Sequence, residues 1–137
     1  MNFLLDTCVL SEAMKERRDP DVQTWIEAAS QQTLFFSAVT IGEIQYGIER
    51  LPTGARRRRL ESWFSEFLIG TGADKRILAF DTEIARVWGT LRVREPNAPL
   101  VESQIAATAL AHGLTLVTRD IRDFAFAGLA VFNPWAK

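Results

Sequence analysis

Short apolar runs alternate with longer segments of helical period along the chain, and the two patterns predict different elements. The first run, Phe3 to Leu5, has no polar residue between its apolar ones, as expected for a strand that is covered on both faces. Runs of this kind predict strands at residues 3–5, 33–36, 77–80, 114–117 and 129–132. Strands that alternate with helices are typical of an α/β fold with a mostly parallel central sheet.

Apolar side chains at helical spacing predict the intervening helices. They fall at about residues 9–15, 20–29, 38–51, 55–68, 82–94 and 101–112. Three of these segments follow a residue suited to an N-cap, namely Asp19, Ser37 and Asp81, and Gly113 is placed to end the last one. No Pro/Gly/Ser-rich linker divides the chain, and 137 residues fit one domain, 1–137.

The charge balance limits how the protein can attract nucleic acid. Sixteen Lys and Arg against 17 Asp and Glu give a formal net charge of −1, so any contact with a polyanion must use local basic groups. The candidates are Arg56–Arg59, Arg86, Arg92, Arg94, Arg119 and Arg122. Phosphate binding and solvated surface are both open interpretations. At a helix start, the four consecutive arginines oppose the helix dipole, which indicates an anionic partner.

Several classes of protein are disfavoured. Cys8 is the only cysteine, so no intrachain disulfide forms, and a reducing, cytoplasmic location is expected. No signal peptide or membrane-spanning run is apparent, and no contact with a membrane is expected. His112 sits at a predicted helix end, which favours a structural role over a Ser–His–Asp triad. Cys8 itself is expected to be a small buried apolar residue.

Carboxylates at the ends of predicted strands are the candidates for chemistry. Asp6 follows the first strand, and Asp120, with Asp123 nearby, follows the strand at 114–117. In open α/β sheets ligands bind at that edge, and Glu43 and Glu102 lie on helices of the same arrangement. If these carboxylates converge within a few ångströms, they repel one another unless a hard cation such as Mg²⁺ or Mn²⁺ compensates their charge. Each residue alone also has a structural interpretation, as a cap, a turn residue or a solvated helix position.

Three segments carry a resemblance to a known family. They are residues 3–12 (FLLDTCVLSE), 37–47 (SAVTIGEIQYG) and 105–120 (IAATALAHGLTLVTRD), supported by Asp123-Phe124 and Asn133-Pro-Trp135. Through them the chain resembles the PIN-domain ribonucleases, specifically the VapC-type toxins of bacterial toxin–antitoxin pairs and their FitB-like branch. The resemblance implies a three-layer sandwich with helices on both faces of the sheet. It also implies an acidic site that holds Mg²⁺ or Mn²⁺, in which Asp6, Glu43 and Asp120 occupy three of the acidic positions and Asp123 is an accessory acid.

The chain departs from the family pattern at two positions. Glu102 stands where the family usually has Asp, which keeps the charge and adds one methylene. Cys8 stands where the family commonly has Asn, which predicts that a polar contact ordering the first acid is missing.

The leading hypothesis is a metal-dependent endoribonuclease that acts as the toxin of such a pair. Asp6, Glu43, Glu102 and Asp120 would hold one or two metal ions, and Thr7 and Thr118 would donate hydrogen bonds to the carboxylates. The resemblance implies an RNA substrate such as tRNA, a cognate antitoxin that covers the site, operator DNA bound only through that antitoxin, and a homodimer.

Two rival hypotheses remain at this point. Because of Glu102 and Cys8, the site could be weakened, with the chain acting mainly in an antitoxin-bound DNA-regulatory complex. A phosphate-transferring hydrolase with Asp6 as nucleophile is disfavoured, because position 8 is not a carboxylate.

Overall fold

A five-stranded sheet in the order β3-β2-β1-β4-β5 runs through the middle of the molecule, and each neighbouring pair of strands is parallel. This computed structural model describes residues 1–135, so the last two residues of the expected domain 1–137 lie outside the described residues. The elements are β1 (Phe3–Leu5), α1 (Thr7–Ala13), α2 (Pro20–Ala28), a 3₁₀ turn η1 (Gln31–Thr33), β2 (Leu34–Ser37), α3 (Ala38–Glu49), α4 (Ala55–Ala73), β3 (Ile77–Leu78), α5 (Thr82–Arg94), α6 (Leu100–His112), β4 (Thr115–Val117), a 3₁₀ turn η2 (Ile121–Phe124) and β5 (Val131–Phe132). The α/β class and the parallel sheet predicted from the sequence are confirmed.

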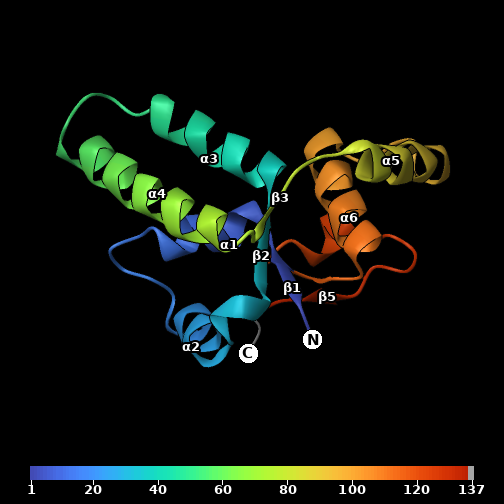
Figure 1. Cartoon of the computed structure of the whole chain (residues 1–137), viewed down its shortest axis with the longest axis horizontal. Helices are drawn as coiled ribbons and strands as arrows, with labels where there is room; N and C mark the ends of the chain where they lie inside the picture. The colour runs from blue at the N-terminus through green and yellow to red at the C-terminus, as the bar shows by residue number, and fades with distance from the viewer. Residues whose placement is uncertain (136–137) are drawn as a thin grey trace.

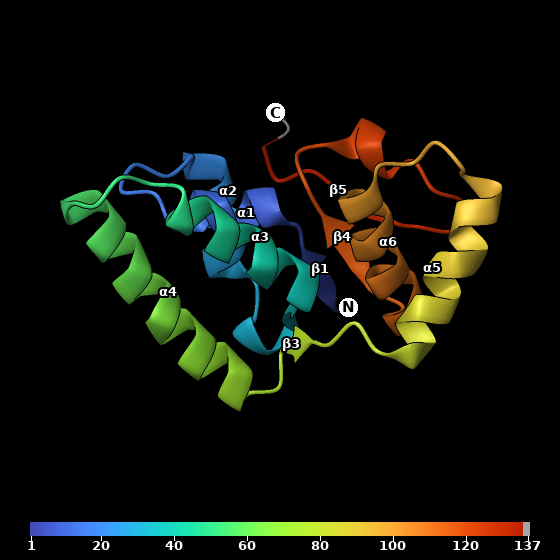
Figure 2. The same ribbon diagram turned by 90° about the horizontal axis from the view of Figure 1, so that it is seen from above.

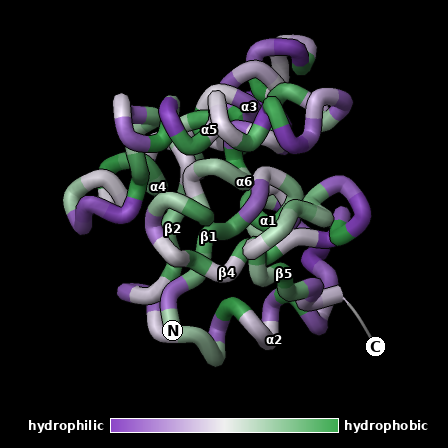
Figure 3. Tube along the Cα trace, turned by 90° about the vertical axis from the view of Figure 1, so that its right-hand side faces the viewer, coloured by the Kyte–Doolittle hydropathy of each residue, from purple (hydrophilic) through white to green (hydrophobic). Residues whose placement is uncertain are grey.

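Helices cover both faces of the sheet, as the resemblance implies (Figures 1 and 2). Helices α1 to α4 lie on one side, and α5 and α6 lie on the other. Consecutive residues of β1 pack on opposite faces of the sheet. Leu5 belongs to the core under α1 to α4, and Leu4 belongs to the core under α6. In Figure 3 the tube is largely hydrophobic along β1 and β4 at the centre. The unbroken apolar run at the N-terminus therefore marks a strand buried on both faces.

The expected N-caps form as the sequence predicts. The carboxylate of Asp19 accepts hydrogen bonds from the N–H groups of Asp21 and Val22 at the start of α2. Ser37 caps α3 and Asp81 caps α5 in the same way. Gly113 ends α6 in the left-handed conformation, with φ of 64°. These caps fix where three helices begin and one ends.

Three predicted helices have wrong boundaries, including the one expected at 38–51, which ends at Glu49. The strands expected at 77–80 and 129–132 are shorter and span Ile77–Leu78 and Val131–Phe132. The first helix was expected at residues 9–15 but spans Thr7–Ala13, because Asp6 already has an extended backbone at the N-cap position. The helix expected to end near residue 68 continues to Ala73, with Thr71 buried in its last turn. Burial of that turn outweighs the cost of about 1 kcal/mol that a helical glycine such as Gly70 or Gly72 imposes.

Helix α4 is 19 residues long, and its first residue, Ala55, is followed by four consecutive arginines. Among the helices of residues 1–135, none combines the length and the apolar character that a membrane crossing requires.

Candidate active site

Asp6 and Asp120 are 114 positions apart in the sequence and meet at the carboxyl end of the sheet. Strands β1 and β4 are parallel neighbours with Leu5 opposite Val117, so the residues that follow them leave the sheet side by side. One ligand atom each from Asp6, Cys8 and Asp120 all lie within 4.8 Å of one another. The sheet register therefore brings together two of the acids predicted from the sequence.

A single hydroxyl links the two acids. Oγ1 of Thr118 donates a hydrogen bond to Oδ2 of Asp6 at 2.8 Å and accepts one from the backbone N–H of Asp120 at 3.0 Å. Thr118 is fully buried and follows β4 directly. The predicted contact between Thr118 and a site carboxylate is confirmed.

Neither carboxylate is used to cap the turn that it precedes. Asp6 stands at the N-cap of α1 and Asp120 at the N-cap of η2, and neither side chain accepts a capping hydrogen bond. Both therefore remain available for other contacts. The alternative interpretation of Asp6 as an ordinary N-cap is not supported, and the Asp120 side chain accepts no capping hydrogen bond in the turn that follows it.

Burial raises the pKa of the Asp6 carboxyl above its usual value. Hydrogen bonds from Thr118, Thr7 and Cys8 act in the opposite direction, and the negative charge of Asp120 raises the pKa further. Asp6 is only 6% exposed, so its charge has little water around it. A cation bound between the two acids would remove this electrostatic cost.

Cys8 contacts the site directly, which the sequence argument missed. Its Sγ donates to Oδ2 of Asp6 at 3.3 Å, lies 3.6 Å from Oγ1 of Thr118, and accepts from the N–H of Arg119 at 3.5 Å. Burial raises the pKa of the thiol to about 12, and the charge of Asp6 adds to the effect. The expectation that a polar contact to the first acid is missing was wrong, because the thiol supplies one.

Thr7 does not hold a carboxylate through its hydroxyl, contrary to the sequence prediction. Its Oγ1 donates to Oγ1 of Thr40 at 3.1 Å and so joins the start of α1 to α3. Glu43 follows Thr40 by one helical turn, and together with Thr7 it lines a cavity of about 280 Å³. Glu43 is thus half-buried beside the residue that follows Asp6, but it is outside the group of three within 4.8 Å.

Glu102 lies half-buried in the first turn of α6, also outside that group. The turn is braced by Ser103, whose Oγ accepts from the indole N–H of Trp88 at 2.9 Å and donates to the carbonyl of Leu100 at 2.7 Å. Asp123 is exposed on η2. It shares an open hollow of about 390 Å³ with Asp120.

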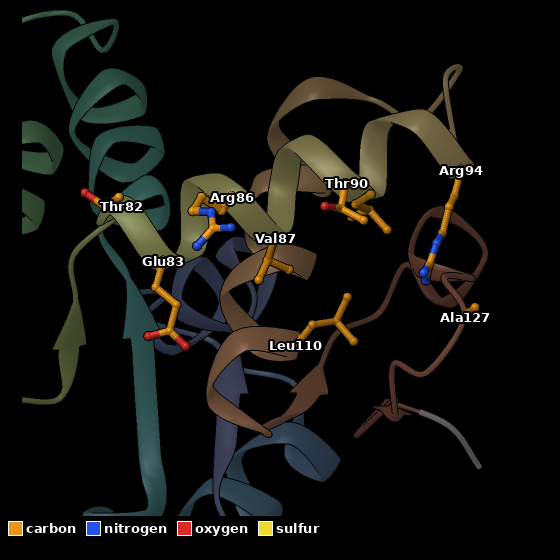
Figure 4. A pocket seen from close by; sticks show the side chains of 9 residues that line it. Thr82, Glu83, Arg86, Val87, Thr90, Arg94, Leu110 and Ala127 are labelled. Atoms are coloured by element: carbon orange, nitrogen blue, oxygen red, sulfur yellow. The ribbon is translucent and has the colours of Figure 1, made fainter.

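The candidate basic residues fall in different places. Arg119 and Arg122 line the same hollow as Asp120, and the guanidinium of Arg119 lies 5.3 Å from the ring centre of Trp135. Arg86 and Arg94 instead line a hollow of about 590 Å³ beside α5, which contains neither Asp6 nor Asp120 (Figure 4). Of these two pairs, only Arg119 and Arg122 share a hollow with Asp120.

Comparison with known proteins places this site in a family. The model of the PIN domain matches residues 3–129. The chain belongs to the PIN-domain family. Among curated PIN-domain relatives, "VapC ribonuclease Y4jK" of Sinorhizobium fredii is 38% identical over 97% of both chains. "Toxin FitB" of Neisseria gonorrhoeae is 32% identical over 97% of this chain and 98% of its own.

Solved structures agree with the family assignment. The crystal structure titled FitAcB from Neisseria gonorrhoeae matches this PIN domain with a TM-score of 0.87 and 32% identity. The match covers 98% of this chain and 99% of the other. The similarity in sequence and in structure thus extends over nearly the whole chain.

Proposed function

We propose that this protein is a metal-dependent endoribonuclease and the toxin of a toxin–antitoxin pair. The observation that carries the proposal is the convergence of Asp6, Asp120 and Cys8 within 4.8 Å, with Glu43 half-buried in the cavity that Thr7 also lines. The relatives named as a ribonuclease and as a toxin, which match over their full length, support it.

The residues present suit a divalent cation. Among residues 1–135, no Lys, Arg or His forms an ion pair with Asp6, Glu43, Glu102, Asp120 or Asp123. Carboxylate oxygens are the donors that Mg²⁺ and Mn²⁺ prefer, and a bound cation would offset the repulsion between Asp6 and Asp120. When bound, the ion would activate water and stabilise charge on the phosphate.

Each acid is given its own role in this proposal. Asp6, held by Thr118 and Cys8, and Asp120, held through its backbone, would be metal ligands. Glu43 would approach from the cavity between α1 and α3, and Glu102 from the braced turn of α6. Asp123 would assist from the exposed side of η2. Glu43, Glu102 and Asp123 lie outside the group of three and would act through longer reach or through water.

A cognate antitoxin, operator DNA bound through it, and a homodimer complete the proposal. The structural neighbours include FitAB bound to a DNA fragment, at 31% identity and a TM-score of 0.87. Large apolar side chains remain exposed in this chain, including Ile69 at 74% and Val93 at 82%. Such side chains are available for contacts with other protein chains. The proposed RNA substrate is supported by the relative named as a ribonuclease, and tRNA is a candidate through the resemblance described above.

Cleavage of total RNA by purified protein tests the proposal. We expect cleavage with Mn²⁺, none with a chelator, and a loss of at least a hundredfold in Asp6→Asn. Glu66→Gln is the matched control, because it removes one exposed carboxylate on α4 without touching the site. Cleavage that persists in both the chelator and the Asp6→Asn variant would contradict the proposal.

Measurement of Mn²⁺ affinity tests the rival hypothesis of a weakened, purely regulatory domain. Asp6 and Asp120 have ligand atoms within 4.8 Å of each other, which does not favour that hypothesis. We expect Mn²⁺ to bind the isolated protein and to raise its melting temperature.

A further inference from the structure

Two adjoining hollows lie between α1, α3 and α4. The inner one, of about 280 Å³, is lined by Thr7 and Glu43 at the candidate site and reaches out to Lys15, Arg56 and Arg59. The outer one, of about 620 Å³, is lined by Lys15, Glu16, Arg17, Ala55, Arg56 and Arg59. Because both share Lys15, Arg56 and Arg59, they form one continuous depression, which we call the basic groove.

The groove is positively charged at its outer end. Four cations line the outer hollow, Lys15, Arg17, Arg56 and Arg59, together with the carboxylate of Glu16. Lys15 pairs with Glu12 at 2.9 Å and Arg59 with Glu16 at 3.1 Å, which leaves an excess of two positive charges. The start of α4 adds to this field, because Gly54 offers no capping side chain and the first turn contains no acid. The N–H groups of that turn therefore present the positive end of the helix dipole.

The structure divides the run Arg56–Arg59 into two kinds of residue. Arg57 donates to the carbonyl of Leu51 at 3.1 Å and pairs with Glu49 at 2.9 Å, which ties α4 to the end of α3. Arg59 donates to the carbonyl of Met14 at 3.2 Å, just beyond α1, and pairs with Glu16 at 3.1 Å. These two arginines support the fold.

The side chains of Arg56 and Arg58 do not tie α4 to the rest of the fold. Within residues 1–135 neither side chain forms a hydrogen bond, an ion pair or a ring contact. Both are exposed, but only Arg56 lines the basic groove. Arg17, which also lines the groove, has no such contact in the described part of the chain either, so the groove holds two uncompensated cations, Arg17 and Arg56. Arg58 is an otherwise similar cation on the same helix as Arg56 but outside the groove.

We propose that the basic groove binds the phosphate backbone of single-stranded RNA next to the bond that is cleaved, with Arg56 as a principal contact. The inference rests on the proposed function and adds the path of the substrate. Thr7 and Ala13 are the ends of α1, about 9 Å apart at helical rise, and Lys15 lies two residues beyond that helix. The groove thus contacts phosphates beyond the one at the acids. A single strand is the form that can follow such a depression with its backbone phosphates and approach Glu43 and Thr7 at its inner end.

Binding of a fluorescein-labelled oligouridine to the Asp6→Asn protein tests this path without cleavage. In the same background, Arg56→Ala should weaken binding about three- to tenfold at low salt and reduce the slope of log affinity against log salt by about 0.7. Arg58→Ala is the matched control, with the same loss of charge on the same helix, and should change neither quantity. Unfolding by heat, measured for both, checks that the fold is kept.

Equal effects of Arg56→Ala and Arg58→Ala would overturn the inference. It would also be overturned if an acidic peptide such as oligoglutamate of equal charge bound as tightly as the RNA and with the same dependence on Arg56. The groove would then be a site for an acidic protein segment. Cleavage of RNA by the wild-type protein is assayed separately. If cleavage depends on Asp6 but Arg56→Ala and Arg58→Ala bind RNA equally well, only the groove is refuted. If the wild-type protein does not cleave RNA, the proposed function itself is refuted.

Discussion

The hydroxyl of Thr118 donates a hydrogen bond to Oδ2 of Asp6 at 2.8 Å while it accepts the N–H of Asp120 at 3.0 Å. Two acids from different parts of the chain are thereby held to one buried atom. Outer contacts of this kind orient ligands and tune a metal site. Their removal should be visible in metal binding before it is visible in the fold.

Thr118→Val should lower Mn²⁺ affinity about 10- to 100-fold, because the valine keeps the volume and removes both hydrogen bonds. Thr118→Ser, which keeps the hydroxyl, is the control and should bind Mn²⁺ nearly as the wild type does. Calorimetric titration of the metal-free proteins measures both. Equal affinities for the valine variant and the wild type would contradict the role given to Thr118.

Cys8→Val should also weaken Mn²⁺ binding, but by less than Thr118→Val. A thiol is a weak donor, and its distance to Oδ2 of Asp6 is 3.3 Å. Cys8→Ser retains a donor and is expected to stay within a few-fold of the wild type. A larger loss in Cys8→Val than in Thr118→Val would show that the thiol, and not the hydroxyl, is the main support of Asp6.

Asp6→Asn should raise the melting temperature of the metal-free protein by a few degrees. The carboxylate is 6% exposed and lies close to Asp120, so its charge destabilises the fold when no cation is present. Added Mn²⁺ should then stabilise the wild type and not the variant. Differential scanning calorimetry with and without Mn²⁺ gives both quantities, and a lower melting temperature for the metal-free variant would refute the argument.

Glu12→Gln should destabilise the protein by about 1–3 kcal/mol at neutral pH. Burial alone raises the pKa of Glu12, but hydrogen bonds from Lys15 and the N–H of Asp19, both at 2.9 Å, lower the pKa below its usual value. The carboxylate therefore contributes stability above its unfolded-state pKa, and that contribution is lost as the pH falls through the lower folded-state pKa.

Urea unfolding across pH checks this prediction. The difference between the wild type and Glu12→Gln should shrink in acid. Glu61→Gln removes an exposed partner of Arg57 at 3.4 Å and serves as the control, with an expected cost below about 1 kcal/mol. A cost for Glu12→Gln that does not change with pH would exclude the ionised carboxylate as its source.

Glu102→Gln should reduce RNA cleavage about 10- to 100-fold, as expected for an acid that reaches a metal ion through water. Glu102→Asp keeps the charge on the braced first turn of α6 and should remain active. Initial rates with saturating Mn²⁺ distinguish the two variants. An inactive Glu102→Asp beside an active Glu102→Gln would contradict a role for the charge.

The sequence predicted the architecture because the pattern of apolar residues is strong. The apolar run Phe3 to Leu5 predicts a strand buried on both faces. Helix starts are predicted at Asp19, Ser37 and Asp81, whose side chains form local capping hydrogen bonds. Local signals of this kind do not depend on the rest of the fold. The length of α4 was underestimated because its last turn is stabilised by tertiary burial of Thr71.

The candidate site was only partly predictable. Asp6 and Asp120 could be identified because each follows a predicted strand, and the carboxyl ends of neighbouring parallel strands lie at the same edge of the sheet. The position of Cys8 depends on contacts with Thr118 and Arg119, more than 100 residues away, and no local pattern reveals them. The same holds for the arginine run, because only the packing of α4 against α1 and α3 decides which cation is engaged.

The pairing of Leu5 with Val117 has a consequence for the chain while it is being translated. During synthesis Asp6 emerges early, but the strand that delivers Asp120 is made more than 100 residues later. Until β4 has been translated and has docked beside β1, the two halves of the proposed nuclease centre cannot meet. If the proposed function is correct, a nascent chain would therefore have no complete nuclease centre until β4 has folded.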